Sequence, residues 1–154
     1  MGIRINYLVE RSVGVPADVV WQRLFSARRH SAAIPGTTVI VHDALGRGVD
    51  RFDVVGAHLS ARTGRSRWAL VDEMEVVAVS PPVEGVPGTA RICKVGWPLR
   101  GCIDITVETC PGGTVVRWAQ ELIVPGIPPW ASRYAAQLAR AAYGRGLDRI
   151  LSAP

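Results

Sequence analysis

The sequence predicts an α+β fold in which a curved antiparallel sheet of about seven strands wraps around a long C-terminal helix. Alternating apolar and polar residues fill most of the chain, and turn signals rich in glycine and proline separate these segments. Such short connections favour antiparallel neighbours, because parallel neighbours need long crossovers. One face of the sheet must be covered, and only the last helical segment is long enough to cover it.

The elements follow one another in a simple order. A first strand covers residues 5–15, and Pro16 ends it at a position that suits the first turn of a helix. Two short helices are expected next, over 16–27 and 28–36. Six strands follow, over 38–44, 51–59, 66–79, 89–97, 102–108 and 114–124, and the tail from about 129 to 151 returns to helix. In this helix Gly144 and Gly146 mark either a kink or a close approach to the sheet.

Composition indicates one globular domain over residues 1–154. Hydrophobic residues make up 48% and charged residues 20%, and no uninterrupted apolar run could span a bilayer. The N-terminal segment carries charges through its middle, so neither a signal peptide nor an anchor is expected, and the predicted location is the cytoplasm. The net charge of +5 comes almost wholly from arginine, since Lys94 is the only lysine among 18 basic residues. No nucleic-acid motif accompanies them, so no nucleic-acid partner is expected.

Metal sites, cofactors and familiar catalytic motifs are not expected. The three histidines are isolated, and the three cysteines lack metal-binding spacing. Reduced structural thiols are the default interpretation. Cys93 and Cys102 would face each other if the chain turns at Trp97-Pro98, which leaves a cross-strand disulfide open.

A candidate binding surface lies on the strand around residues 113–121, read GTVVRWAQE. One face of this strand places Trp118 and Gln120 among aliphatic residues. A buried amide without partners costs roughly 1–3 kcal/mol, so an ordinary dry core would not carry Gln120 there. A cavity that holds a partly polar ligand would, and we expect one of at least about 300 Å³ between the sheet and the last helix.

This strand and the PGIP turn after it resemble the C-terminal portion of aromatic polyketide aromatase/cyclases. The resemblance identifies the chain with the polyketide cyclase/dehydrase, START-like (SRPBCC, Bet v 1-like) superfamily and implies its helix-grip fold. In these aromatase/cyclases, another strand bears a tryptophan pair and an inward arginine that holds the ketone or enolate. Aligned on Trp68, the second tryptophan corresponds to Leu70 and the arginine to Met74, which cannot stabilise an oxyanion as a cation does. The nearest cationic alternatives along the sequence are Arg91, Arg100 and Arg117.

The same strand offers a carboxylate. Alternation places Asp72 on the face of Trp68, Leu70 and Met74, whereas Glu73 and Glu75 face outward. If a bulge breaks the alternation, Asp72 is instead a solvated edge residue. The candidate catalytic groups are Asp72, Gln120 and Tyr134. The predicted ligand-binding set is Trp68, Leu70, Asp72, Met74, Trp97, Trp118, Gln120, Trp130 and Tyr134. For any single tryptophan the favoured alternative is core packing, whereas Trp118 together with Gln120 favours the pocket.

These features predict a protein that binds a hydrophobic or polycyclic small molecule in an internal cavity. It is either an enzyme of the polyketide cyclase/dehydrase type or a non-catalytic carrier of lipid or another hydrophobic ligand. Contact of the basic last helix with an acidic partner or a membrane surface stays open, as does the choice between monomer and homodimer.

Overall fold

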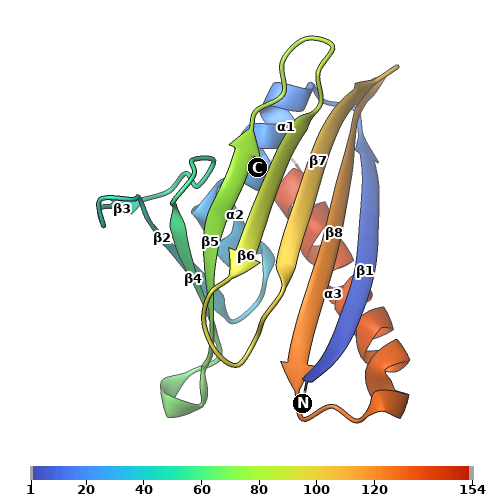
Figure 1. The fold of residues 1–154 in the computed structure, drawn as a ribbon. Helices are drawn as coiled ribbons and strands as arrows, with labels where there is room; N and C mark the ends of the chain where they lie inside the picture. Colours follow the sequence, from blue (N-terminus) through green and yellow to red (C-terminus); the bar gives the residue numbers. More distant parts are fainter. Residues whose placement is uncertain (1, 153–154) are drawn as a thin grey trace.

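The computed structural model describes residues 2–152 and is built on one eight-stranded antiparallel sheet. Its strands are β1 (Gly2–Val13), β2 (Thr37–His42), β3 (Gly48–Val49), β4 (His58–Thr63), β5 (Leu70–Ser80), β6 (Gly88–Lys94), β7 (Cys102–Cys110) and β8 (Gly113–Pro125). Across the sheet they lie in the order β1-β8-β7-β6-β5-β4-β2-β3 (Figure 1). The first strand therefore pairs with the last, and the remaining neighbours follow chain order until β4, which pairs with β2.

Two short helices and one long helix cover one face of this sheet. The helices α1 (Ala17–Leu24) and α2 (Ala27–Ala33) follow β1, and α3 (Ser132–Leu151) ends the chain after a 3-10 turn, η2 (Pro129–Ala131). Figure 1 shows α3 behind β7, β8 and β1, where it packs against β1 and both short helices. The predicted helix-grip arrangement is confirmed.

Only the C-terminal half of α3 is buried. Its buried residues are Gly144, Gly146, Leu147, Ile150 and Leu151. The helix is continuous through both glycines, so the close approach to the sheet is the correct alternative. A Cβ atom on Gly144 would lie 2.8 Å from the Arg11 guanidinium and 3.9 Å from the Val9 side chain of β1.

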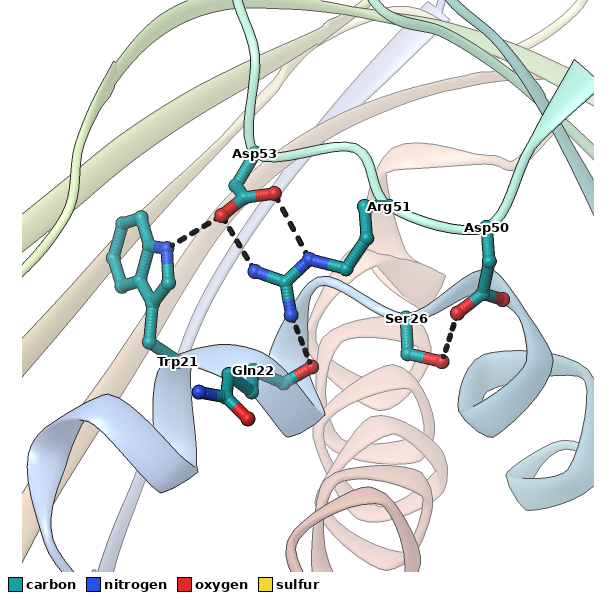
Figure 2. A network of polar contacts seen from close by, with 6 residues as sticks. All are labelled: Trp21, Gln22, Ser26, Asp50, Arg51 and Asp53. Atoms are coloured by element: carbon teal, nitrogen blue, oxygen red, sulfur yellow. Dashed lines mark hydrogen bonds and ion pairs between the residues drawn. The ribbon is translucent and has the colours of Figure 1, made fainter.

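The segment over 51–59 does not form the predicted strand. Residues 52–57 are largely irregular, and β4 begins only at His58. Figure 2 shows the reason: polar side chains bind this segment to α1 and the α1–α2 junction. The Asp53 carboxylate accepts from Trp21 Nε1 at 3.1 Å and from Arg51 Nη2 at 2.5 Å, and the Asp50 carboxylate accepts from Ser26 Oγ at 2.9 Å. The eighth strand, missed by the sequence analysis, is the two-residue β3.

Cys93 and Cys102 form a disulfide between β6 and β7. The default interpretation of reduced thiols is thus wrong for this pair, and the alternative from the turn at Trp97-Pro98 is the correct one. Cys110 is free and partly buried.

Candidate functional site

A cavity of about 250 Å³ lies between the sheet and the C-terminal half of α3. This volume is somewhat below the expected minimum of about 300 Å³, so the cavity suits a small ligand. Apolar residues from several strands, α2 and α3 make most of its wall. The polar side chains that line it are His30, Thr37, Thr63, Asp72 and Tyr143.

A buried ion pair stands at one side of the cavity. Lys94 Nζ, at the end of β6, donates to Asp72 Oδ2 on β5, and the two side chains are 1% and 12% exposed respectively. The other oxygen, Asp72 Oδ1, is buried and accepts no hydrogen bond from the described residues. Leaving a buried acceptor unpaired is costly, and more so for a charged group. A ligand that donates a hydrogen bond would remove this cost.

A neutral network lies beside the cavity, on β8 and β1. Gln120 Oε1 accepts from the Tyr7 hydroxyl at 2.5 Å and from Trp118 Nε1 at 3.2 Å. Because an indole nitrogen can only donate, the amide oxygen must face Trp118 and the amide nitrogen must point elsewhere. Gln120 Nε2 is buried and has no acceptor among the described residues.

Tyr143 of α3 lies between these two groups of residues. Its ring centroid is 5.5 Å from that of Tyr7 and 6.5 Å from that of Trp118. Burial, and then the charge of Asp72, raises the pKa of the Tyr143 hydroxyl above its ordinary value. Burial also raises the pKa of Tyr7, with Tyr143 as the next cause. Both phenols are therefore hydrogen-bond donors throughout the physiological pH range.

His30 of α2 completes the polar lining. Its Nε2 lies 2.7 Å from the Leu24 carbonyl oxygen, to which it must donate because a carbonyl only accepts. Burial lowers the pKa of His30, although the Leu24 carbonyl opposes the shift. The imidazole is consequently neutral near pH 7, with Nδ1 as an acceptor.

The structure brings five of the predicted site residues together. Leu70, Asp72, Met74 and Trp118 line the cavity, whereas Gln120 is buried beside Trp118 and does not itself line it. The alternation that pointed Asp72 inward holds from Leu70 to Val76, because the bulge in β5 comes only after Val76. The Asp72 side chain is 12% exposed, against 30% for Glu73.

The other predicted site residues lie outside the cavity. Trp68, Trp97, Trp130 and Tyr134 are 81%, 79%, 76% and 53% exposed. Trp68 belongs to a 3-10 turn, η1 (Ser66–Trp68), so the alternation of β5 begins only at Leu70. Trp97 lies in the β6–β7 connection, beyond the sheet. Trp130 and Tyr134 belong to η2 and the first turn of α3, well before the buried half of that helix.

Sequence reasoning missed Lys94, Tyr143 and His30 as site residues. Lys94 had two signals: it is the only lysine, and it continues the inward alternation of Ala90 and Ile92 on β6. The other cationic alternatives lie elsewhere: Arg91 pairs with Asp104, Arg117 pairs with Glu10 and Glu108 on the outer surface, and Arg100 is exposed. Tyr143 had a weaker signal: it precedes Gly144, one of the two glycines at which a close approach of the helix to the sheet was an open alternative.

No family model matches the sequence, and no curated protein is significantly similar to it. Solved structures match over nearly the whole chain. SA2116 of Staphylococcus aureus, a protein of unknown function, has a TM-score of 0.72 at 8% identity, with 97% of this chain and 92% of that chain covered. The di-domain ARO/CYC StfQ from the steffimycin biosynthetic pathway has a TM-score of 0.67 at 12% identity, with 96% of this chain and 49% of that chain covered. A norcoclaurine synthase point mutant from Thalictrum flavum, in complex with a transition-state analogue, has a TM-score of 0.62 at 13% identity, with 98% and 96% covered.

The chain has the helix-grip fold, which it shares with these structures. These identities are low, so the likeness shows the fold alone. In this chain the space between the sheet and α3 is a cavity with mostly apolar walls.

None of the helices in residues 2–152 is both long and apolar enough to cross a membrane. Within the same residues, no group of three or more His, Cys, Asp or Glu side chains is placed to hold a metal ion.

Proposed function

We propose that this protein binds a small hydrophobic or aromatic molecule in the cavity and that the molecule donates a hydrogen bond to Asp72 Oδ1. The observation that carries the proposal is the unpaired carboxylate oxygen in a mostly apolar cavity. Lys94 holds the other oxygen, so the carboxylate is fixed in position with one acceptor left for a ligand. Apolar walls supply affinity, and the single placed acceptor supplies orientation.

The reaction that fits this arrangement is of the polyketide cyclase or aromatase type. Lys94 lies directly opposite Met74 across the β5–β6 pair, and Met74 is where the resembling aromatase/cyclases place an arginine. Lys94 of β6 therefore supplies a cation next to the position at which those enzymes have an arginine on β5. In such a reaction the cavity positions a folded poly-β-ketone, and Asp72 Oδ1 accepts a proton from a carbon next to a carbonyl. Similarity in fold to StfQ supports this candidate.

A non-catalytic carrier of hydrophobic ligands is the second candidate. The small volume argues against a long acyl chain, and the buried ion pair argues against a ligand without polar groups. A carrier of a small phenol-like or amide-like molecule satisfies both observations.

The binding test compares two probes of similar shape, 2-naphthol and naphthalene, which differ by one hydroxyl donor. We expect 2-naphthol to quench tryptophan fluorescence and raise the melting temperature at lower concentration than naphthalene, because only 2-naphthol can donate to Asp72. Asp72→Asn should remove this difference, and the matched change Glu75→Gln on the same strand should preserve it. Equal binding of both probes by the unchanged protein would contradict the assigned role of Asp72.

A separate assay decides between enzyme and carrier. Incubation with a poly-β-ketone mimic, followed by mass spectrometry of the products, should reveal loss of water and a cyclised product. We expect Asp72→Asn to abolish this product and Glu75→Gln to retain it. Binding without any product, in a protein that discriminates between the two naphthalene probes, would establish the carrier.

A further inference from the structure

The three exposed tryptophans lie at one edge of the sheet. The register brings Gly2 of β1 beside Pro125 of β8, Thr63 of β4 beside Leu70 of β5, and Cys93 of β6 beside Cys102 of β7. The connections over 64–69, 95–101 and 126–131 therefore leave the same edge, which Figure 1 shows at the bottom, near the N-terminus. Each carries one indole that is more than three quarters exposed: Trp68 at 81%, Trp97 at 79% and Trp130 at 76%. We call these three connections, together with the strand and helix residues next to them (62–70, 95–101 and 126–138), the tryptophan edge.

The charge of the tryptophan edge is uniformly positive. Residues 62–70, 95–101 and 126–138 contain five arginines and no acidic residue: Arg62, Arg65, Arg67, Arg100 and Arg133. None of the five forms an ion pair with a carboxylate of residues 2–152. Two of them lie over exposed aromatic rings, Arg67 at 5.3 Å from the Trp68 centroid and Arg133 at 5.4 Å from the Tyr134 centroid.

The opposite edge differs in both respects. Its connections expose aliphatic residues such as Leu45, Val54 and Val83, but no tryptophan. They also contain four acidic residues, Asp43, Asp50, Asp53 and Glu84. Exposed indoles and unpaired positive charge therefore occur together at one edge only.

The cavity extends towards the tryptophan edge. The cavity is lined by three residues at strand ends on this edge, Thr37, Thr63 and Leu70. Leu99 of the β6–β7 connection lines it as well. Leu70 is 43% exposed, so the cavity wall is continuous with the surface there. A partner that covers this edge would cover the region through which a hydrophobic ligand can enter.

We propose that the tryptophan edge binds the surface of an anionic lipid bilayer, with its indoles at the depth of the headgroups. Tryptophan is enriched at this depth because its ring is apolar and its N–H is polar, and each arginine near the surface adds attraction to anionic headgroups. The indoles belong to three separate connections and none of them lines the cavity, which suits a flat bilayer better than a single protein hot spot. The attachment is peripheral and is independent of which molecule occupies the cavity.

The test is co-sedimentation of the full chain with vesicles of phosphatidylcholine alone and of phosphatidylcholine with phosphatidylglycerol. We expect binding to the anionic vesicles only, weakened by salt, and a blue shift of the exposed tryptophan emission on binding. The triple variant Trp68→Ala/Trp97→Ala/Trp130→Ala should bind at least about tenfold more weakly. Arg65→Gln and Arg67→Gln should each weaken binding roughly fivefold. The matched control is Leu45→Ala/Val54→Ala/Val83→Ala at the opposite edge, which should bind as the unchanged protein does.

Two results would overturn the proposal. One is equal loss of vesicle binding in the triple tryptophan variant and the opposite-edge control, after circular dichroism has shown both to be folded. The other is absence of binding to anionic vesicles together with salt-sensitive binding to polyglutamate, which would assign the basic edge to an acidic protein.

Discussion

The two sides of the cavity satisfy their buried polar groups in different ways. On the β5–β6 side, Asp72 and Lys94 form a buried ion pair. On the β8–β1 side, Gln120, Trp118 and Tyr7 form a network of neutral groups. Each side leaves one buried atom without a partner among residues 2–152, an acceptor on Asp72 and a donor on Gln120.

This difference determines how each side should respond to change. Removing one member of a buried ion pair leaves a full charge in a poorly solvated place, whereas removing one member of a neutral network leaves only an unpaired dipole. The β5–β6 side is consequently the one where a single substitution costs most. It is also the side where a ligand gains most by supplying the missing hydrogen bond.

The largest expected effect is that of Lys94→Met. We expect it to lower the free energy of unfolding by about 3–5 kcal/mol, because it leaves the Asp72 carboxylate buried and unpaired. The double change Asp72→Leu/Lys94→Met should recover most of this loss, since an apolar pair carries no unpaired charge. Urea denaturation at pH 7 measures both variants.

A matched control for Lys94 is Arg117→Met, which removes an exposed cation from its pairs with Glu10 and Glu108. Exposed ion pairs contribute at most about 1 kcal/mol each. If Lys94→Met were no more destabilising than Arg117→Met, the contrast between a charged and a neutral side of the cavity would be lost.

The second effect concerns the neutral side. Gln120→Leu removes the one acceptor that residues 2–152 offer to both the Tyr7 hydroxyl and the Trp118 indole, so two buried donors lose their partner. We expect a loss of about 2 kcal/mol, less than for Lys94→Met, because both stranded groups are uncharged. The exposed residue Gln22 provides the control, and Gln22→Leu should change stability by less than about 0.5 kcal/mol. If Gln120→Leu lowered the free energy of unfolding as much as Lys94→Met, the two sides of the cavity would not differ in the cost of losing a buried partner.

Sequence patterns predicted most of the fold because alternation and turn residues are local signals. They placed β1, the helix pair, β5 to β8 and the last helix in the right order. The prediction of a strand over 51–59 was wrong because Asp53 and Asp50 accept hydrogen bonds from side chains of α1 and of the α1–α2 junction. Alternation along the sequence cannot reveal such long-range contacts. The disulfide was left open for a similar reason, as it depends on the register of β6 against β7.

Site residues within strands were predicted correctly, whereas those in turns and connections were not. Asp72, Met74, Trp118 and Gln120 follow strand alternation, and all face inward. Trp68, Trp97 and Trp130 are in turns and connections, where alternation has no meaning, and all three are exposed. The predicted ligand-binding set contained four tryptophans, and three of them are on the outer surface.

A third and smaller effect is expected for Tyr7→Phe. It removes one of the two hydrogen bonds to Gln120 Oε1 and should cost about 1 kcal/mol at pH 7. The pH dependence should change as well. Burial raises the pKa of Tyr7 above 10.0, so above pH 10 the unfolded chain ionises first and stability falls as pH rises. Urea denaturation near pH 7 and above pH 10 should therefore show a smaller alkaline loss for Tyr7→Phe, and an unchanged alkaline loss would contradict the burial of this hydroxyl.

The smallest effect concerns His30, whose ring packs 5.4 Å from Phe52 and 6.3 Å from Trp118, next to the neutral side. Burial lowers its pKa below 6.5, so below pH 6.5 the unfolded chain takes up a proton that the folded chain does not. Stability is thus fully present above pH 6.5 and declines as pH falls, by at most about 1.4 kcal/mol per pH unit. His30→Asn should flatten this decline between pH 6.5 and 5.5, whereas His42→Asn, at an exposed histidine, should leave it in place. A decline that is the same in both variants would mean that His30 is protonated in the folded protein. The cavity wall beside Trp118 would then carry a positive charge, and the β8–β1 side could no longer be called neutral.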